Sequence, residues 1–306
     1  MLSNKMLDII ITSYNEPKAT LRAVNTFLNQ NIKEKFKIIV CDPFPEVGDF
    51  LKKNLKDKRV GFFLDPGEGK SYALNLLFKK LNSKNKEDIF IFTDGDVYVS
   101  DNAVKGIFEA FKDEKIGCVT AKPVPIDDRN TKYGYFSHFA FAGIDKARKK
   151  LSDNQKFFEC SGYLFAIRKG VIDEFPIDSS EDAIIPYLFW KKNYKIKYLP
   201  NVEVYVKNPG NLKDYLNQKI RNIKAHENLD KLAPDMPRTK TFWNEIKHGW
   251  YFLFIYPKSF KEFFWTIQLY FLRLYIYLKA FKDLRKKEVY TDGWREVETE
   301  STKPLD

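Results

Sequence analysis

The chain has 306 residues, of which 44% are hydrophobic, and it carries a formal net charge of +11. This length and apolar content suffice for a substantial core, so a disordered chain is excluded as the default and one large domain, or a domain with an extension, is expected. The positive charge predicts a partner of opposite sign, such as a nucleic acid, an anionic membrane or a phosphorylated substrate.

Cys41, Cys118 and Cys160 are odd in number and widely spaced, which argues against a disulfide framework and for a reducing compartment. From Met1 the chain leads into the short apolar run Leu7 to Ile11 without a longer hydrophobic region or a small-residue cleavage site. We therefore expect no signal peptide and a cytoplasmic protein.

Up to about residue 120, short apolar runs alternate with amphipathic stretches, as in strand and helix units around a mostly parallel sheet. The predicted strands are Asp8 to Ser13, Phe36 to Cys41, Gly61 to Leu64 and Ile89 to Thr93. Helices are predicted over Lys18 to Asn29, over Ser71 to Leu81, and after a capping Ser100 where Val104, Ile107, Phe108 and Phe111 share a face. The fold class expected is α/β.

The pattern loosens after Thr120, and residues 123 to 158 are predicted to form long loops and one helix near a ligand cleft. Further strands are expected at Leu164 to Ile167 and Ile196 to Leu199, with a helix from Asp182 to Lys191 between them. The Pro-bearing stretch Leu232 to Thr239 is typical of a linker. We therefore divide the chain into a domain over residues 1–231 and an aromatic-rich helical extension over residues 232–306.

Within the extension, residues 248 to 281 are dense in aromatic side chains, but charges interrupt every apolar run before it reaches the roughly 20 residues that a membrane-spanning helix needs. One broad helical face collects Phe260, Phe263, Ile267, Phe271, Leu274, Leu278 and Phe281. Such a face suits the headgroup boundary of a membrane or packing against the main domain, and the pattern leaves both open.

Asp94-Gly95-Asp96 directly follows the apolar run Ile89 to Phe92. Two carboxylates one residue apart at the end of a buried strand suit a hard divalent cation, with Gly95 leaving room for a ligand between them. The alternative is an ordinary turn, because Asp-Gly is a common turn dipeptide.

Other polar residues are expected at the same edge of the sheet, where parallel strands end. Tyr14 and Glu16 follow the first strand and suit a base or a ribose, and Asp42 follows the second and can accept from a base N–H. Lys70 enters a helix after Gly69 and can neutralise a diphosphate, whereas Leu64 stands where a P-loop needs glycine, which excludes that motif. Turn chemistry alone also explains the first three.

Two helical segments add further candidates. Asp182 precedes Pro186 by four residues, so it lies in or just before a first helical turn, where it either caps the helix or stays ionised as a general base. Gln218 and Arg221 are three apart and project together, which suits a diphosphate, although a solvated basic helix gives the same pattern.

In order and spacing, these segments resemble the family-two glycosyltransferases of GT-A fold from about residue 6 to residue 226. The resemblance implies a Rossmann-like sheet flanked by helices, a nucleotide-sugar donor, a Mn²⁺ or Mg²⁺ cofactor held at a DXD motif, and inversion at the anomeric carbon. It implies that Tyr14 and Asp42 hold the nucleobase, that Glu16 and Lys70 lie near the nucleotide, and that Asp182 is the general base. Asp96 would bind the metal, and Asp94 the ribose or the metal. Gln218 and Arg221 match the Q-x-x-R-W motif of processive members, but Asn222 replaces its Trp, which argues against processive synthesis.

From these features we expect transfer from a UDP-sugar, in preference, to a glycan or lipid-linked acceptor in surface-glycan, polysaccharide or glycolipid synthesis. Peripheral membrane contact through residues 248–281 would place the protein at the inner face of the membrane, and no nucleic-acid partner is expected. Two alternatives stay open: a sugar-phosphate nucleotidyltransferase-like enzyme, and a non-catalytic basic module that binds membrane or nucleic acid.

Overall fold

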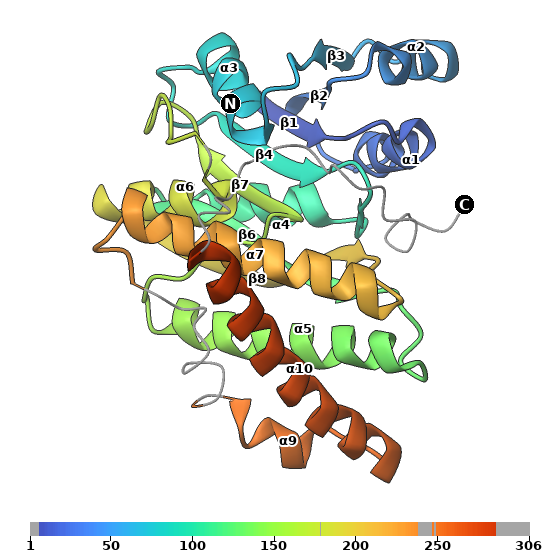
Figure 1. Cartoon of the computed structure of the whole chain (residues 1–306). Coiled ribbons are helices and arrows are strands. Elements are labelled where there is room, and N and C mark those ends of the chain that lie inside the picture. The colour runs from blue at the N-terminus through green and yellow to red at the C-terminus, as the bar shows by residue number, and fades with distance from the viewer. Residues whose placement is uncertain (1–5, 178, 238–246, 248, 286–306) are drawn as a thin grey trace.

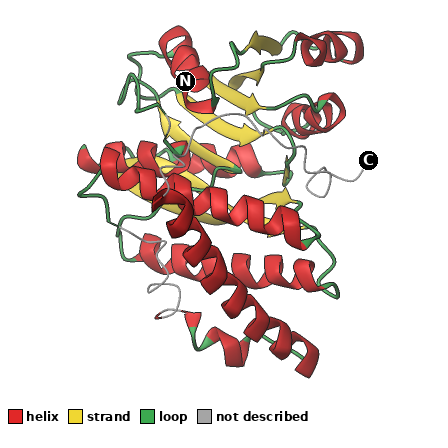
Figure 2. Cartoon of the chain, viewed as in Figure 1, coloured by secondary structure: helices red, strands yellow, loops and turns green. Residues whose placement is uncertain are grey.

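The computed structural model describes residues 6–177, 179–237, 247 and 249–285. An eight-stranded sheet of order β3-β2-β1-β4-β7-β6-β8-β5 forms its centre, with helices on both faces (Figures 1 and 2). Its strands are β1 (Met6–Thr12), β2 (Lys35–Asp42), β3 (Val60–Leu64), β4 (Ile89–Asp94), β5 (Tyr98–Val99), β6 (Ile116–Pro125), β7 (Leu164–Arg168) and β8 (Lys195–Val206). The predicted α/β class is confirmed.

Strand direction decides which loops meet. β3, β2, β1 and β4 are parallel, β7 is antiparallel to β4 and to β6, and β8 is parallel to β6. β6 and β8 therefore run in the direction of β4. As a result β1, β2, β3, β4, β6 and β8 all end at one edge of the sheet, where β7 begins. We call this the carboxyl edge.

Helices cover the sheet because side chains alternate between its faces. Ile9 and Ile11 of β1 point into the core beneath α1 (Pro17–Leu28), α2 (Pro45–Asn54) and α4 (Ala103–Ala110), whereas Ile10 points toward α3 (Lys70–Leu81) and α6 (Glu181–Lys191). All three isoleucines are fully buried. Their burial on both faces explains why β1 is a continuous apolar run rather than an alternating one.

Two expectations about local structure are wrong, and one helix was missed. Residues 123–158 contain the one helix expected, α5 (Lys132–Asp153), but its 22 residues and the continuation of β6 to Pro125 replace the long loops. α5 contacts β6, β8 and the C-terminal helix, so its apolar positions do not follow one stripe. Ser100 does not cap α4, since its hydroxyl accepts from the backbone N–H of Glu203 on β8. Finally, α2 was not expected after Asp42-Pro43, although Pro45 at its first turn is a start signal.

The C-terminal region is helical, as expected. α7 (Leu212–Leu232) is followed by a short α9 (Phe252–Ile255) and by α10 (Phe260–Arg285), and α10 packs against α7 and α5 (Figure 1). Leu269, Ile276 and Ala280 of α10 are buried in this contact. The linker predicted over Leu232 to Thr239 begins where α7 ends, and residues 238 and 239 lie outside the described part of the chain.

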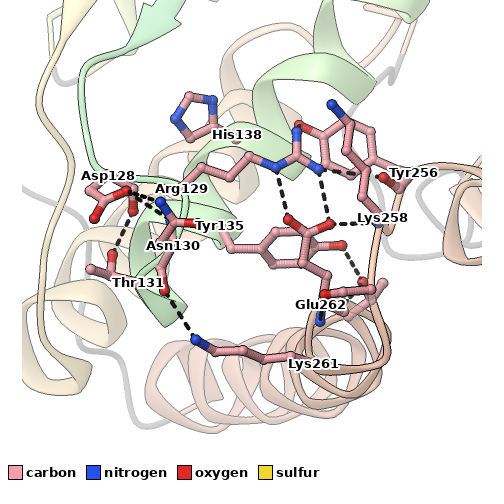
Figure 3. A network of polar contacts seen from close by, with 12 residues as sticks. Asp128, Arg129, Asn130, Thr131, Tyr135, His138, Tyr256, Lys258, Lys261 and Glu262 are labelled. Carbon is pink, nitrogen blue, oxygen red and sulfur yellow. Dashed lines mark hydrogen bonds and ion pairs between the residues drawn. The ribbon is translucent and has the colours of Figure 1, made fainter.

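Arg129, in the loop between β6 and α5, fastens α10 to the sheet domain. Its guanidinium donates to both carboxylate oxygens of Glu262, at 2.9 and 3.1 Å, and to the hydroxyl of Tyr256 at 3.1 Å (Figure 3). Behind this network the hydroxyls of Tyr135 and Thr266 lie 2.6 Å apart. The forked geometry of the arginine orients the start of α10 as well as attracting it.

Cys41, Cys118 and Cys160 are free and buried, as predicted. Among the described helices, none is both long enough and apolar enough to cross a membrane.

Candidate active site

The turn after β1 is organised by Asp42, at the end of β2. Its carboxylate accepts from the Ser13 hydroxyl at 2.6 Å, from the Asn15 N–H at 3.1 Å and from the Phe44 N–H at 2.8 Å. Burial raises the pKa of Asp42, against the opposing effect of these hydrogen bonds. Asp42 is fully buried, so in this structure the carboxylate predicted to hold a base holds the protein's own turn.

The same turn positions the side chain of Tyr14. Its ring meets that of Phe44 edge to face, with the centroids 5.1 Å apart, while Asn15 adopts a positive φ of 53°. Glu16 then stands at the N-cap position of α1. Tyr14 and Glu16 are therefore both held, half-buried, at the carboxyl edge, as the sequence predicts.

Asp94-Gly95-Asp96 packs directly against the C-terminal end of β1. Gly95 donates its N–H to the carbonyl of Thr12 at 2.8 Å, and a Cβ on Gly95 would lie only 2.6 Å from the Cβ of Ser13. The space beside Gly95 is thus filled by Ser13 and not left open for a ligand. The residues form a turn, and that turn presents two half-buried carboxylates at the carboxyl edge.

Lys70 joins this turn to a carboxylate that the sequence did not single out. Its ammonium lies 2.8 Å from Asp94 Oδ1 and 2.6 Å from Glu181 Oε1. Burial by itself would lower the pKa of Lys70, but the two carboxylates raise it above its usual value. Lys70 is placed by Gly69, whose φ of 103° turns the chain into α3. The three charges form one cluster, Asp94–Lys70–Glu181.

Glu181 was missed because its partners lie far away in the sequence. A helix start with adjacent acids predicts favourable interaction with the helix dipole, and nothing in that pattern points to a lysine in another helix. In the folded chain Glu181 is the first residue of α6 and only 8% exposed.

Asp182, next along α6, is half-buried and does not cap the helix, because Ser180 occupies the N-cap position. The Ser180 hydroxyl donates to Asp182 Oδ1 at 2.5 Å. The backbone carbonyl of Asp182 accepts from the Cys160 N–H at 2.9 Å. Its Oδ2 is the atom nearest to where a Cβ on Gly162 would lie, at 3.7 Å. These contacts place Asp182 beside the loop that leads into β7, at the carboxyl edge.

Gln218 and Arg221 both lie on α7. Arg221 is exposed, and Gln218 is half-buried with an Oε1 atom that has no hydrogen-bond partner among the described residues. In the described part of the chain, no hydrogen bond or ion pair joins either side chain to Lys70 or Asp94. One turn beyond Arg221, His226 Nδ1 lies 3.6 Å from Glu159 Oε2.

The described residues contain no group of three or more His, Cys, Asp or Glu side chains that could hold a metal without help. Asp94 and Asp96 nevertheless suit Mg²⁺ or Mn²⁺, which are commonly bound by one or two carboxylates together with the phosphates of a substrate. In this structure the cation beside Asp94 is the Lys70 ammonium, 2.8 Å from Oδ1.

The mannosyltransferase PcManGT from Pyrobaculum calidifontis, solved in complex with GDP-Man and Mn²⁺, has a similar structure, with a TM-score of 0.64 over 92% of this chain and 88% of that one. At 15% sequence identity this likeness concerns the fold, and it confirms the GT-A architecture. An uncharacterised glycosyltransferase of Rickettsia bellii (strain RML369-C) is 30% identical over 97 residues, which make up 29% of this chain and 14% of that protein. The family model for glycosyl transferase family 2 matches residues 8–175, more than half of the chain, and the protein therefore belongs to glycosyl transferase family 2.

Proposed function

We propose that the protein is an inverting, metal-dependent transferase that moves a sugar from a nucleotide-sugar donor to a hydroxyl of a glycan or lipid-linked acceptor. The observation that carries the proposal is the cluster Asp94–Lys70–Glu181 directly beside Asp182, with contacts of 2.8 and 2.6 Å between side chains from three separate segments. A structural turn or a helix cap would need none of these side chains to converge.

In the proposed donor site, Tyr14 lies against the nucleobase, Asp42 holds the turn that positions Tyr14, Glu16 supports the nucleotide, and Lys70 lies beside the diphosphate. Asp94 and Asp96 would hold the Mn²⁺ or Mg²⁺ ion, which when bound neutralises charge on the diphosphate as it leaves. Gln218 and Arg221 are the least supported donor contacts, since no hydrogen bond or ion pair joins them to the charged cluster in the described part of the chain. A UDP-sugar is our first choice, and the GDP-Man bound by PcManGT makes GDP-sugars the second.

In the proposed reaction, Asp182 takes the proton of the acceptor hydroxyl. The acceptor oxygen then forms a bond to the anomeric carbon as the bond from that carbon to the diphosphate oxygen breaks, on the opposite face of the sugar. One displacement of this kind inverts the anomeric carbon. Because Ser180 holds Oδ1 of Asp182 at 2.5 Å, the other oxygen, Oδ2, is assigned to proton transfer.

Asp182→Asn tests the proposal. We expect transfer to fall at least about 100-fold, in line with the contribution of general bases, while the affinity for donor stays within twofold. Asp101→Asn, at an exposed aspartate outside the site, is the control and should leave both unchanged. If Asp182→Asn reduces donor binding as much as transfer, Asp182 is a structural residue and not the base.

The donor is identified by thermal stabilisation with a panel of UDP-, GDP- and dTDP-sugars, with and without Mn²⁺, since a ligand that binds the folded state raises its apparent stability. Product analysis separates the alternative enzyme, because a nucleotidyltransferase would release a nucleotide-linked product in place of a glycoside. A panel in which no nucleotide-sugar stabilises the protein would count against the proposed donor class.

A further inference from the structure

The exposed apolar side chains of this protein are concentrated at one end. Of the 14 large apolar side chains exposed in the described part of the chain, ten lie between Trp250 and Phe281. Their exposed fractions reach 87% for Phe260 and 70% for Phe271. We call the surface formed by the following side chains the aromatic face: Phe254, Phe260, Phe264, Phe271, Leu278 and Phe281. Concentrations of this kind mark interaction sites, whereas single exposed apolar residues do not.

The aromatic face is not the side by which α10 packs onto the protein. Leu269, Ile276 and Ala280 make that contact with α5 and α7. The sequence pattern had grouped Phe260, Phe271 and Leu278 into one stripe and left open whether it meets the domain or a membrane. A different stripe of α10 packs on the domain, so the described residues leave the aromatic face uncovered.

Within the described residues 249–285, the exposed charges have one sign. The two acidic residues of α10 are turned inward: Glu262 to Arg129 at 2.9 Å, and Asp283 to Lys224 at 3.3 Å and Lys279 at 2.8 Å. The Asp283 side chain is only 8% exposed. The exposed charged side chains of the described residues 249–285 are all basic, namely Lys258, Lys261, Lys279, Lys282 and Arg285. An apolar surface bordered by exposed lysines complements an anionic, apolar-cored partner.

The aromatic face is also fixed in position relative to the carboxyl edge. The loop that carries Arg129 follows the end of β6 at that edge, and its guanidinium grips Glu262 and Tyr256 at the start of α10 (Figure 3). α9 and α10 extend beyond the β8 side of the sheet, away from β3 and α2 (Figure 1). Across its 26 residues α10 is about 39 Å long, at ~1.5 Å per residue, and so forms a long platform.

We propose that the aromatic face binds the surface of a bilayer that contains anionic lipids, with its Phe side chains at the headgroup boundary and the bordering lysines on lipid phosphates. Phenylalanine and lysine in this arrangement are typical of helices that lie in the interface plane. A second copy of the chain fits less well, because a symmetric pairing of this face would bring two sets of like charges together. The proposal adds a site of action to the enzyme and does not depend on which sugar is transferred.

The test uses the full chain and sedimentation with vesicles of phosphatidylcholine alone or of phosphatidylcholine with phosphatidylglycerol. We expect binding to the mixed vesicles that weakens as salt rises. The triple variant Phe260→Ser/Phe264→Ser/Phe271→Ser should bind at least tenfold more weakly. A matched control, Leu64→Ser/Leu212→Ser, changes exposed apolar side chains elsewhere and should bind as the parent does.

The melting temperature of the triple variant should equal that of the parent, because all three side chains are exposed. Absence of vesicle binding by the parent protein would overturn the proposal. So would binding that the triple variant retains in full, since this would show an attraction by the overall charge of +11 alone. A concentration-dependent dimer that the triple variant loses, without lipid binding by the parent, would assign the face to a second copy.

Discussion

Gly95→Ala tests whether the two carboxylates of the Asp94-Gly95-Asp96 turn must rest directly on the end of β1. A Cβ at residue 95 would lie 2.6 Å from the Cβ and 3.3 Å from the Cα of Ser13, and 3.1 Å from Thr20 Oγ1. The Ser13 atoms cannot rotate away, because they belong to or adjoin the backbone, and the Ser13 hydroxyl is tied to Asp42 at 2.6 Å. Restoring an ordinary contact of 3.4 Å requires the turn to move by about 0.8 Å.

That displacement sets the size of the expected effect. Overpacking of a tight site costs about 1–3 kcal/mol of stability, whereas a shift approaching 1 Å in catalytic groups costs on the order of 100-fold in rate. We therefore expect kcat/KM for sugar transfer to fall by about two orders of magnitude, while the protein stays folded at 25 °C. The loss should appear largely as weaker Mn²⁺-dependent donor binding, because Asp94 and Asp96 move together.

Gly143→Ala is the matched control. Gly143 lies inside α5, and a Cβ there would meet nothing within 4 Å. Since alanine favours a helix over glycine by about 1 kcal/mol, this variant should melt slightly higher and transfer sugar at the parent rate. A Gly95→Ala enzyme with parental kcat/KM and donor affinity would refute the reasoning, because it would mean that the turn does not need its position on β1.

Three further changes test separate parts of the site and its attachment. Glu181→Gln removes one of the two carboxylates that hold Lys70, a charged hydrogen bond worth about 1.5–3 kcal/mol, so transfer should fall about tenfold or more; unchanged steady-state kinetics would make Glu181 dispensable. Asp96→Ala should abolish the gain in donor affinity that Mn²⁺ produces in calorimetry, and an undiminished gain would remove Asp96 from the metal site. The hydrogen bonds from Arg129 hold the pKa of Glu262 below its ordinary 4.5, so the stability that Glu262 contributes is complete above that pH and is lost as pH falls through the lowered pKa. Glu262→Gln should thus melt below the parent at pH 7, and the gap should narrow as pH falls below 4.5 through the lowered pKa, whereas a gap that does not change with pH would assign the loss to packing.

The regular elements follow from short-range patterns. Buried strands such as β1, β2 and β4 are apolar runs of the right length, and α1 and α3 carry one apolar side at helical spacing, so their existence and approximate bounds were readable from the chain. The order of strands and helices then implied that the residues after β1, β2 and β4 share one edge, because parallel strands end together. That is why Tyr14, Asp42 and Asp94 were identifiable as candidates, whereas Asp182 was identified from its position at a predicted helix start.

Contacts across the fold were not readable in this way. Lys70 and Glu181 are separated by more than a hundred residues, and their 2.6 Å contact depends on how α3 and α6 pack on the same face of the sheet. Gly95 looked like room for a ligand, yet the parallel pairing of β1 with β4 brings Ser13 into that space. Both results depend on strand pairing and packing, which no local spacing encodes.

The extension shows the same division. Its composition and period determined that residues 260–281 form a helix with an aromatic stripe, because side chains three and four apart share a side of any helix. Only the tertiary structure decided which side meets the protein, since α10 is apolar on more than one side and the choice depends on the partners that α5, α7 and Arg129 offer. A helix carries its own periodicity, but the surface against which it packs is built by other parts of the chain.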